Sequence, residues 1–500
     1  MKKFVIVGAS SAGLISAGLI KTYWKNEVEV SVYYDAKNKG VSVGESTIPD
    51  ILQFLHMMDI PIESFLSNTN TTIKTGIKFK DWTPNTEFFH GFGELGPQVE
   101  GGHGPEIYSI LNDDFCSRLY NKPTTTVPSS LMQDFSGRHA FHIDAKEFTD
   151  YLFNYMKKAI NFVDDTVEKV NVDGENITSI ECKNSGTVTA DYFIDATGFS
   201  RLLFKNLDPK WNDLSDYLPI NRAIPQQIPY KFDELPSYTL SEATDNGWIW
   251  QIPIRNRYGT GYMYSSRFTS DDEAREKYNA WLLKNFNTEL QTDRIIKYES
   301  GYYEDYWIGN CLSVGLANGF IEPLESTGIH LAQQSISTFI LCNPSLSDLD
   351  YNRVQANEHN RWVYECIFRF ITLHYNTNRT DSEFWKYMTE NKTEWVKMFD
   401  EKCRTEYMEP ELLSFGMYLW DTASYLQIAN GLKMINKESL VNYLNSKRDV
   451  PFKTTYPSGI DIHRSSEQQY LDIKNHRRHS KYVSHKKLID SYHTARGFKS

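Results

Sequence analysis

One short segment places a carboxylate beside three small residues where a helix is expected to begin. In residues 319–341, GFIEPLESTGIHLAQQSISTFIL, Pro323 ends the preceding element and apolar residues recur at helical spacing, so a buried helix is predicted to begin near Ser326. Unpaired backbone N–H groups and the helix dipole favour a small anion at that point. Ordinary capping by Ser326 or Thr327 is the alternative. Glu325 would repel an anion there unless its carboxylate points away.

A second segment, TTIKTGIKFKDW at residues 71–82, could supply a reactive amine. Read as one strand, it has an apolar face and a lysine face made of Lys74, Lys78 and Lys80. A lysine face in contact with water is the ordinary interpretation. A lysine turned into a dry channel would differ chemically, because desolvation favours the neutral amine, which is a nucleophile.

The segment GWIWQIP, residues 247–253, predicts an aromatic wall. On a strand, Trp248, Trp250 and Ile252 share one face, because side chains alternate along a strand. Two indole rings on one face suit either an ordinary apolar core or a wall beside a large flat molecule. This segment alone does not decide between them.

The elements that must position these residues begin with a nucleotide-binding βαβ unit. FVIV is a predicted buried strand, GASSAG a tight turn, LISAGLIKTYW a helix, and VEVSVYYD a second strand that ends in Asp35. Small residues at Gly8, Ser10 and Gly13 would let the helix N-terminus approach a pyrophosphate. Asp35 lies where a carboxylate accepts hydrogen bonds from a ribose hydroxyl. The turn predicts a dinucleotide, either FAD or NAD, against the alternative of a glycine-rich turn without a ligand.

Two later segments bear on the choice of dinucleotide. The literal GxGxxG in GFGELG, residues 91–96, leads into PQVEGGHGPE, which cannot begin a helix, so a loop is predicted there. DYFIDATGFSR, residues 191–201, runs from a buried strand into small residues, which is typical of the floor of an FAD site but also of an ordinary strand and turn. The sequence has no second nucleotide-binding pattern, in which a strand, a glycine turn, a helix and a terminal acidic residue follow one another. A dedicated NAD(P)H domain is therefore not expected, and reducing equivalents would come from outside.

Composition limits the remaining classes. The 500 residues are 40% hydrophobic and 14% aromatic, which predicts a folded chain, and a net charge of -11 argues against a general nucleic-acid binder. The six cysteines form neither a CxxC pair nor a zinc-type cluster, so we expect a reduced cytoplasmic protein without a metal. The apolar N-terminus is explained by the first strand rather than by a signal peptide, and no segment of about 20 residues is apolar enough to span a membrane.

Four of these segments, GASSAG, GIKFKDW, GWIWQIP and FIEPLESTG with its F-x-x-P-x-x-S-x-G spacing, together resemble the flavin-dependent halogenases of the tryptophan halogenase family. The resemblance continues in consistent order through GVSVGESTIPDI, FFHGFG, YGTGYMYSSRFTS and HYNTNRTDSEFW, and covers most of residues 1–390. The abundance of Asn, Lys and Tyr suggests a phage-encoded member.

The resemblance implies an α/β, Rossmann-type FAD-binding flavoprotein similar to the aromatic hydroxylases. Residues 1–340 would form the FAD-binding unit with an inserted mixed β-sheet, and residues 341–500 a mainly helical substrate cap with a basic tail. The implied reaction uses FAD reduced by a separate flavin reductase, O2 and a halide ion to form hypohalous acid, which halogenates an electron-rich aromatic ring. A homo-oligomer is possible on this basis, and neither a membrane nor a nucleic acid is an expected partner.

The resemblance also implies roles for individual residues. The catalytic residues would be Lys78, Glu325 and Ser326, and the halide would bind the backbone amides of Thr327 and Gly328. Lys78 would hydrogen-bond hypohalous acid or become a haloamine, while Glu325 would orient the electrophile or remove the proton of the substrate. Because a haloamine requires a neutral amine, Lys78 is expected to be buried with a lowered pKa, whereas Lys74 and Lys80 are expected to face water.

The implied flavin contacts lie in the N-terminal turn, in a mobile strap at VGESTIP and in later loops. They are Gly8, Ser10, Ser11, Gly13, Asp35, Gly44, Glu45, Ser46, Thr47, Asp195, Gly198, Gly315 and Ile329. In the strap, Ser46 or Thr47 is expected to cap a helix whose first turn contains Pro49.

The implied substrate and tunnel residues are His90, Phe92, Trp248, Trp250 and Trp420. His90 and Phe92 would lie on one face of an aromatic substrate and Trp420 on the other, with Trp248 and Trp250 beside the flavin and the tunnel. Enzymes of the family that act on free tryptophan carry a Tyr-Tyr pair and a Glu shortly before the position that Trp420 occupies here. EYMEPELLSFGMYLW, residues 406–420, has no such pair, so an indole or phenol other than free tryptophan is the expected substrate.

Two other functions remain open at this stage. An FAD-dependent aromatic monooxygenase would oxidise NAD(P)H itself and would carry a Gly-Asp pair where this chain has SVGLANG. A non-catalytic flavin-binding protein would keep the motifs without the activity. The basic segment KNHRRHSKYVSHKK near the C-terminus predicts a solvated tail or a last helix, with binding of nucleic acid as the alternative.

Overall fold

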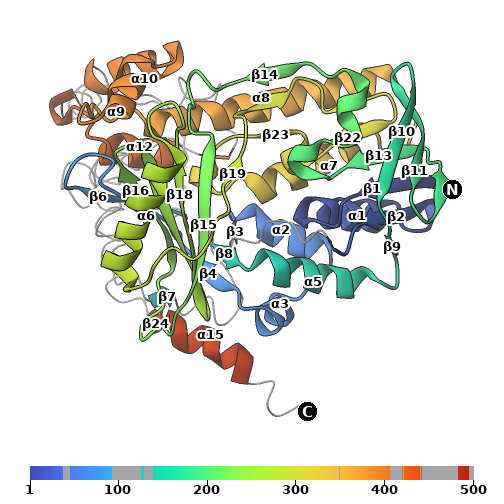
Figure 1. The fold of residues 1–500 in the computed structure, drawn as a ribbon, viewed down its shortest axis with the longest axis horizontal. Helices are drawn as coiled ribbons and strands as arrows, with labels where there is room; N and C mark the ends of the chain where they lie inside the picture. Colours follow the sequence, from blue (N-terminus) through green and yellow to red (C-terminus); the bar gives the residue numbers. More distant parts are fainter. Residues whose placement is uncertain are drawn as a thin grey trace, which may run out of the picture.

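The computed structural model describes residues 1–37, 45–92, 126–128, 139–347, 349–405, 419–420, 422–439, 441 and 482–494. It confirms the predicted α/β fold, in which helices and two large sheets lie side by side (Figure 1). Gly44 and most of GFGELG lie outside the described residues. Within the described part of the chain, no helix is both long and apolar enough to cross a membrane.

The first large sheet contains the predicted βαβ unit. Its strand order is β21-β22-β13-β1-β2-β9, with bounds Trp307–Ile308, Cys311–Ser313, Tyr192–Asp195, Lys2–Val7, Val28–Tyr34 and Asn161–Asp164. β1 pairs in parallel with both β2 and β13, and Val7 lies opposite Asp195. Helix α1, Ser11–Trp24, connects β1 to β2 as predicted. The order of the strands reverses at β1, which is where an open α/β sheet binds its ligand.

The second large sheet contains the aromatic wall. Its strand order is β19-β15-β18-β17-β16-β5-β6, with bounds Ile296–Lys297, Arg222–Pro229, Arg257–Tyr264, Gly247–Ile254, Tyr238–Thr244, Gly76–Lys80 and Glu87–Gly91. Trp248, Trp250 and Ile252 all point into one apolar core, whereas Ile249 packs in a different core beneath α6, Asp271–Phe286. The predicted alternation along GWIWQIP is therefore confirmed.

The lysine segment is not one strand, and that prediction is wrong. Residues Thr72–Lys74 form β4, which pairs with β8, Ala140–Ile143, in a small sheet that also contains β3, Glu45–Ser46. The chain then changes sheets at Thr75, whose N–H donates to the carbonyl of Ser237 at 2.7 Å, and continues as β5. Because alternation is interrupted at Thr75, Lys74 and Lys78 do not share an environment.

The described helices after the second sheet are α7, Gly328–Cys342, α8, Asp350–His374, α9, Glu383–Glu390, α10, Glu394–Thr405, α12, Thr422–Gly431, and α15, His485–Thr494. α8 is the long helix along the top of the molecule in Figure 1. Its Asn357 donates to the carbonyl of Trp307 in the first sheet, while its last residue, His374, reaches the second core. The division at residue 340 stays a prediction.

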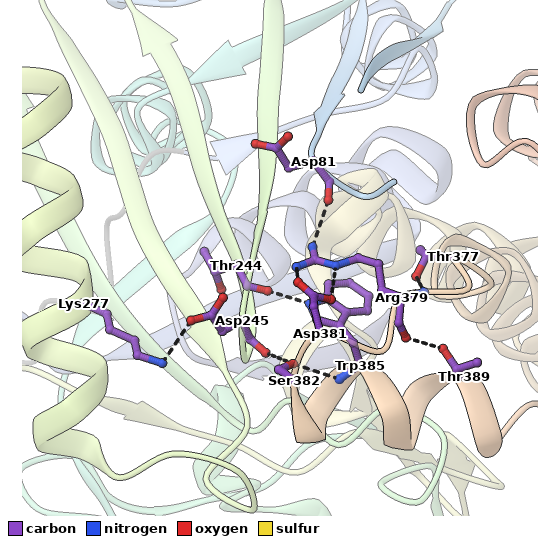
Figure 2. Close-up of polar contacts among 10 residues, drawn as sticks. All are labelled: Asp81, Thr244, Asp245, Lys277, Thr377, Arg379, Asp381, Ser382, Trp385 and Thr389. Carbon is purple, nitrogen blue, oxygen red and sulfur yellow. Dashed lines mark hydrogen bonds and ion pairs between the residues drawn. The ribbon is translucent and has the colours of Figure 1, made fainter. Parts of the chain in front are cut away.

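The segment after α8 holds the turn that precedes β17 (Figure 2). The indole N–H of Trp385 donates to the carbonyl of Thr244 at 2.7 Å, and the Ser382 hydroxyl donates to the carbonyl of Asp245 at 2.5 Å. Arg379 donates to the carbonyl of Asp81 at 2.9 Å, pairs with Asp381 and lies over the Trp385 ring. These bonds fix the start of β17, which carries the tryptophan wall, to the end of α8.

The C-terminal helix packs against the body of the protein. His485, at the start of α15, is fully buried, and its Nε2 accepts a hydrogen bond from the Ile73 N–H at 2.9 Å. Strand β24, Tyr482–Ser484, pairs with β7, Thr126–Pro128. The described end of the basic segment is thus a packed last helix that supports β4, rather than a solvated tail.

The remaining elements connect these units. They are α2 Asp50–Met57, α3 Ile62–Asn68, α5 Ala145–Met156, β10 Val167–Asp173, β11 Asn176–Cys182, β12 Gly186–Val188, β14 Trp211–Asp213, β20 Gly301–Tyr303, β23 Gly319–Phe320 and the short 3-10 helices η1 Lys25–Glu27, η3 Gly198–Ser200, η4 Phe204–Leu207, η5 Gly315–Ala317 and η6 Pro323–Glu325.

Candidate active site

Three loops that follow neighbouring parallel strands form the candidate flavin crevice. Gly8 follows β1, residues 196–198 follow β13, and η5 begins at Gly315 soon after β22. In a doubly wound sheet the carboxyl ends of such strands, next to the point where the order reverses, form the ligand crevice. The sheet therefore brings together three segments that lie as much as 300 residues apart in the chain.

The geometry of these loops fits a dinucleotide. Gly8 has a φ of 110°, and a Cβ added there would lie 2.4 Å from the carbonyl oxygen of Ala196. A Cβ on Gly13 would lie 1.9 Å from the carbonyl oxygen of Gly8, so both glycines are required for this close turn. Ser10, the N-cap of α1, makes no side-chain cap, and its hydroxyl donates to Ala196 instead. The amides of the first turn of α1, which begins at Ser11, therefore have no intrahelical acceptor and are available to a phosphate.

The two predicted carboxylate contacts differ. Asp35 lies partly exposed just after β2, and its Oδ1 accepts a hydrogen bond from the Lys37 N–H at 2.9 Å. Asp195 is fully buried, and its carboxylate accepts hydrogen bonds from the N–H groups of Thr197, Leu203 and Phe204. Burial raises the pKa of Asp195, although these bonds oppose the effect. The Asp195 carboxylate thus shapes its own loop, and its contact with the cofactor stays a prediction.

Gly198, in the loop that Asp195 orders, leaves room for a ligand. It has a φ of 65°, and a Cβ added there would meet no atom within 4 Å. Gly315 has a φ of 58° and packs closely on α1, because its added Cβ would lie 2.8 Å from Ala12. Ile329 is 8% exposed near the start of α7. All three stay predicted flavin contacts.

The structure reverses the expected roles of the two lysines. Lys74 is fully buried, and its amine donates to the carbonyl of Thr47 at 3.0 Å and to the hydroxyl of Ser326 at 2.8 Å. Burial lowers the pKa of Lys74 to about 7, although the charge of Glu325 acts in the opposite direction. Lys78 instead remains 22% exposed and forms an ion pair with Glu87 at 2.6 Å. The expectation that Lys78 is desolvated while Lys74 faces water is therefore wrong.

Lys74 meets the predicted anion site at the start of α7. Ser326 has a left-handed backbone with a φ of 64°, Thr327 is the N-cap of the helix, and neither side chain caps it. The structure describes no hydrogen-bond partner for the buried Thr327 hydroxyl, and a Cβ added at Gly328 would meet no atom within 4 Å. Simple side-chain capping does not explain this turn. Its N–H groups, an unpaired hydroxyl and open space suit a small anion.

Glu325 points away from that helix start, as an anion site requires. It is fully buried, and its carboxylate accepts hydrogen bonds from His90 Nδ1 at 2.9 Å and from His374 Nε2 at 2.9 Å. Burial by itself raises the pKa of Glu325, but the charges and hydrogen bonds of His90 and His374 outweigh burial and lower it to about 2. The carboxylate is therefore ionised over the whole physiological range of pH.

The described part of the strap is tied to Lys74. The Thr47 carbonyl accepts a hydrogen bond from the Lys74 amine, and the Thr47 N–H donates to the carbonyl of Phe141 at 2.9 Å. The Ser46 hydroxyl lies in hydrogen-bond contact with the Thr239 hydroxyl at 2.9 Å. Burial, helped by the charge of a neighbouring aspartate, raises the pKa of Glu45 to about 7. Pro49, rather than Ser46 or Thr47, is the N-cap of α2, so the capping prediction for the strap is wrong.

Aromatic side chains surround this polar centre. Lys74 lies over the ring of Phe92 at 4.9 Å, and Trp248 packs 6.4 Å from Trp250. Trp420 stacks on Phe370 at 4.0 Å, and Phe370 also contacts His90 at 5.6 Å. A substrate between His90, Phe92 and Trp420 stays a prediction. Most of residues 406–420, where the Tyr-Tyr pair would lie, are outside the described residues.

A second buried carboxylate supports the wall. Glu322 accepts hydrogen bonds from the Trp248 indole at 3.1 Å and from the Tyr375 hydroxyl at 2.5 Å. Burial raises the pKa of Glu322 to about 7, although both hydrogen bonds lower it. Trp248 is thus oriented by a polar bond as well as by packing.

Sequence reasoning missed Lys74, His374, Phe370 and Glu322 as members of this centre. For His374 and its neighbour Tyr375 a signal was present, since both belong to the HYNTNRTDSEFW segment that carried part of the resemblance. Phe370 lies one helical turn earlier on the same helix.

The first sheet has a glycine turn at the point where its strand order reverses, and a buried lysine and a buried carboxylate lie beside the anion site. These features together define a nucleotide-dependent α/β enzyme. The family model for tryptophan halogenase matches residues 3–444, and the chain belongs to this family of flavin-dependent halogenases. Tryptophan 7-halogenase RebH from Lentzea aerocolonigenes is 30% identical over 416 residues, which are 77% of this chain and 78% of that relative. Tryptophan 6-halogenase SttH from Streptomyces toxytricini is 28% identical over 421 residues, 77% of this chain and 80% of that relative.

Solved structures agree with this membership. The crystal structure of SttH superimposes with a TM-score of 0.85 at 26% identity and covers 98% of this chain and 100% of its own. A tryptophan halogenase from Shewanella frigidimarina NCIMB 400 superimposes with a TM-score of 0.86 at 22% identity and covers 99% of this chain and 98% of its own, which shows the shared fold. The chain is therefore a flavin-dependent halogenase enzyme.

Proposed function

We propose that this halogenase uses Lys74, rather than Lys78, to hold or carry the halogen that it transfers to an electron-rich aromatic ring. The observation that carries the proposal is the placement of Lys74, fully buried and bonded to both Thr47 and Ser326. It joins the strap, on one side, to the anion site at the start of α7, on the other. Lys78, on β5 between β16 and β6, is partly exposed, forms an ion pair with Glu87 and lies 5.8 Å from the centre of the Tyr238 ring.

The crevice beside Gly8, Gly13 and Gly198 would hold FAD, whose reduced form, together with O2, supplies the oxidising power for hypohalous acid. A separate reductase is expected to deliver the reduced cofactor, because the sequence contains no second nucleotide-binding unit. A cytoplasmic setting follows the same expectation, since the described cysteines are free thiols.

The halide would bind at the start of α7. Backbone N–H groups of Thr327 and Gly328 and the Thr327 hydroxyl are donors at this turn, where Thr327 is buried and Gly328 is exposed, and the helix dipole adds favourable charge. Ser326 has a left-handed backbone conformation at this turn, and its hydroxyl accepts a hydrogen bond from the Lys74 amine. The halide site and the lysine are therefore in direct contact through Ser326.

The contacts of Lys74 suit a neutral amine. A neutral amine has two hydrogens, which match its two donated bonds, and one lone pair, which is left for an electrophile. In the haloamine route, that lone pair forms a bond to the halogen of hypohalous acid, the O–X bond breaks, and the hydroxide leaves with an amine proton as water. The ammonium form would instead donate a hydrogen bond to hypohalous acid. Because the pKa of Lys74 is lowered to about 7, both forms are accessible near neutral pH.

Glu325 is better suited to stabilising a positive charge than to removing a proton from the substrate. With its pKa lowered to about 2, the carboxylate is a weak base but a permanent negative charge in a buried site. Attack on the halogen makes the aromatic ring cationic, and a fixed carboxylate stabilises that developing charge.

The substrate is expected to be an indole or phenol rather than free tryptophan. Residues 406–420 contain no Tyr-Tyr pair to bind the carboxylate and amine of an amino acid. Phe92, His90 and Phe370 supply aromatic surface beside Lys74 and Glu325. The named tryptophan halogenases act on tryptophan, so the two substrate classes are compared directly in the test below.

The test is a halogenation assay with a matched pair of lysine variants. Purified protein is incubated with FAD, a flavin reductase, NADH, O2 and chloride, bromide or iodide, and offered indoles, phenols and free tryptophan. Mass spectrometry should find halogenated product from the wild type and from Lys78→Ala, but none from Lys74→Ala. Loss in Lys78→Ala with retention in Lys74→Ala would overturn the assignment. Hydroxylated product without halogen would identify a monooxygenase, and fastest turnover of free tryptophan would refute the substrate proposal.

A further inference from the structure

The two ring nitrogens of His374 both face hydrogen-bond acceptors. Nδ1 lies 2.7 Å from the carbonyl oxygen of Phe370, and Nε2 lies 2.9 Å from Glu325 Oε1. A carbonyl oxygen has only lone pairs, so Nδ1 must carry a proton, and an ionised carboxylate makes the same demand on Nε2. The contact of His90 with Glu325 differs, because it requires a proton only on Nδ1.

The position of His374 at a helix end favours a positive charge on its ring. His374 is the last residue of the 25-residue helix α8, where the negative end of the helix dipole stabilises a cation. The ring is fully buried and lies 5.1 Å from the ring of Phe79 and 5.0 Å from that of Phe370. Among the described residues, the titratable groups that face this cluster are Glu325 from η6, His90 from β6 and, beyond Glu325, Lys74 from β4.

We infer that His374 is a positioning residue that stays protonated on both ring nitrogens and keeps Glu325 ionised while balancing its charge. The inference rests on the proposed role of Lys74. An unbalanced carboxylate would attract a proton to the Lys74 amine, whereas a carboxylate already paired with an imidazolium leaves that amine able to lose its proton. The contrary arrangement is a neutral pair, in which the proton lies on Glu325 and Nε2 of His374 accepts it.

The first measurement locates the protons and does not depend on catalysis. The full chain, which has 13 histidines, is labelled with 15N at histidine, and NMR signals of the wild type are compared with those of His374→Gln and His359→Gln. His359 is the matched control because it lies on the same helix, fifteen residues earlier, and contacts Gln334 rather than Glu325. The signal lost only in His374→Gln should show protons on both nitrogens at pH 7. An unprotonated Nε2 would overturn the inference.

The second measurement distinguishes the charge of His374 from its role as a hydrogen-bond donor to Glu325. Gln at position 374 keeps an amide donor for Glu325 but removes the charge, so the proton affinity of Lys74 should rise. The acidic limb of the halogenation rate against pH should then move upward by about one pH unit, which lowers the rate roughly five- to tenfold below pH 7 and restores it near pH 9. An equal loss at every pH would overturn the charge role, and His359→Gln should keep the wild-type profile.

The failures of the two proposals are distinguishable. If the wild type forms no halogenated product, the proposed function fails, and the NMR measurement still decides the state of His374. If His374→Gln does not fold, neutron diffraction from deuterated crystals of the full wild-type chain shows directly whether both ring nitrogens carry a deuteron.

Discussion

Replacing Lys74 by Met should abolish halogenation and at the same time stabilise the folded protein. The reason is that folding buries this amine completely, in contact with Thr47, Ser326 and the ring of Phe92. Burial lowers the pKa of Lys74 from 10.5 to about 7, which means that the folded state disfavours the ammonium form. Met keeps a flexible apolar side chain of similar length without the charge.

The size and sign of the effect follow from proton linkage. Below pH 7 both folded and unfolded chains hold the proton, and folding bears the full penalty of burying it. As pH rises from about 7 toward 10.5, only the unfolded chain holds the proton, so this penalty shrinks and the wild type gains stability. At about 1.4 kcal/mol for each pKa unit, the penalty is ~4 kcal/mol at pH 7 and ~2 kcal/mol at pH 9. Two lost hydrogen bonds offset ~1–2 kcal/mol of the gain at either pH.

Urea denaturation at pH 7 and pH 9 measures this prediction. Lys74→Met should raise the free energy of unfolding by ~2–3 kcal/mol at pH 7, and its advantage over the wild type should narrow by ~2 kcal/mol at pH 9. Lys78→Met is the matched control, because it loses a partly exposed ion pair with Glu87, worth less than about 1 kcal/mol, and a cation–π contact with Tyr238 of similar size. A Lys74→Met protein that is less stable than the wild type at both pH values, or whose advantage does not narrow, would refute the reasoning.

Three further predictions follow from the same geometry. In Gly198→Asn, the new side chain tolerates the left-handed backbone but occupies the space expected for the flavin, so FAD binding should weaken about tenfold or more in a fluorescence titration. Gly186→Asn is the control, because Gly186 lies on a hairpin with a similar φ and similar free space, and its replacement should not change FAD binding. Thr327→Val removes a buried hydroxyl without a partner in the described structure and should raise the KM for halide about tenfold with no loss of thermal stability. Glu322→Gln should raise the free energy of unfolding by ~2–3 kcal/mol at pH 8 but by less than ~1 kcal/mol at pH 5, because the pKa raised to about 7 makes ionisation unfavourable only in the folded state. An equal effect of Glu322→Gln at both pH values would contradict it.

The parts of the fold that could be predicted depend on short-range patterns. The βαβ unit is encoded within 35 residues by a buried strand, small residues at Gly8 and Gly13, and a helix, so the local signal and the structure agree. The tryptophan wall could be predicted for a similar reason, because β17 runs without a break through Trp248 and Trp250 and the alternation holds. The start of α7 was predicted within two residues.

The choice between lysines could not be made from the same kind of pattern. Alternation compares side chains only while one strand continues, and the chain leaves its first sheet at Thr75 for a hydrogen bond with Ser237, 162 residues away. The residues on either side of that break are chemically alike, so composition and spacing cannot show which lysine is buried. Only the tertiary contacts with Thr47 and Ser326 distinguish Lys74 from Lys78.

The charge balance of the site is a property of the assembled fold for the same physical reason. Glu325 looked unfavourable beside an anion site in the sequence, because a carboxylate repels an anion unless it points away. Its partners come from 235 residues earlier, His90, and 49 residues later, His374. A buried carboxylate without such partners would be protonated or would hold a proton on Lys74. The reactive state of the lysine is therefore decided by where α8 ends, and a one-residue shift of that helix end, by inserting Ala before His374, should abolish halogenation even with every catalytic residue present.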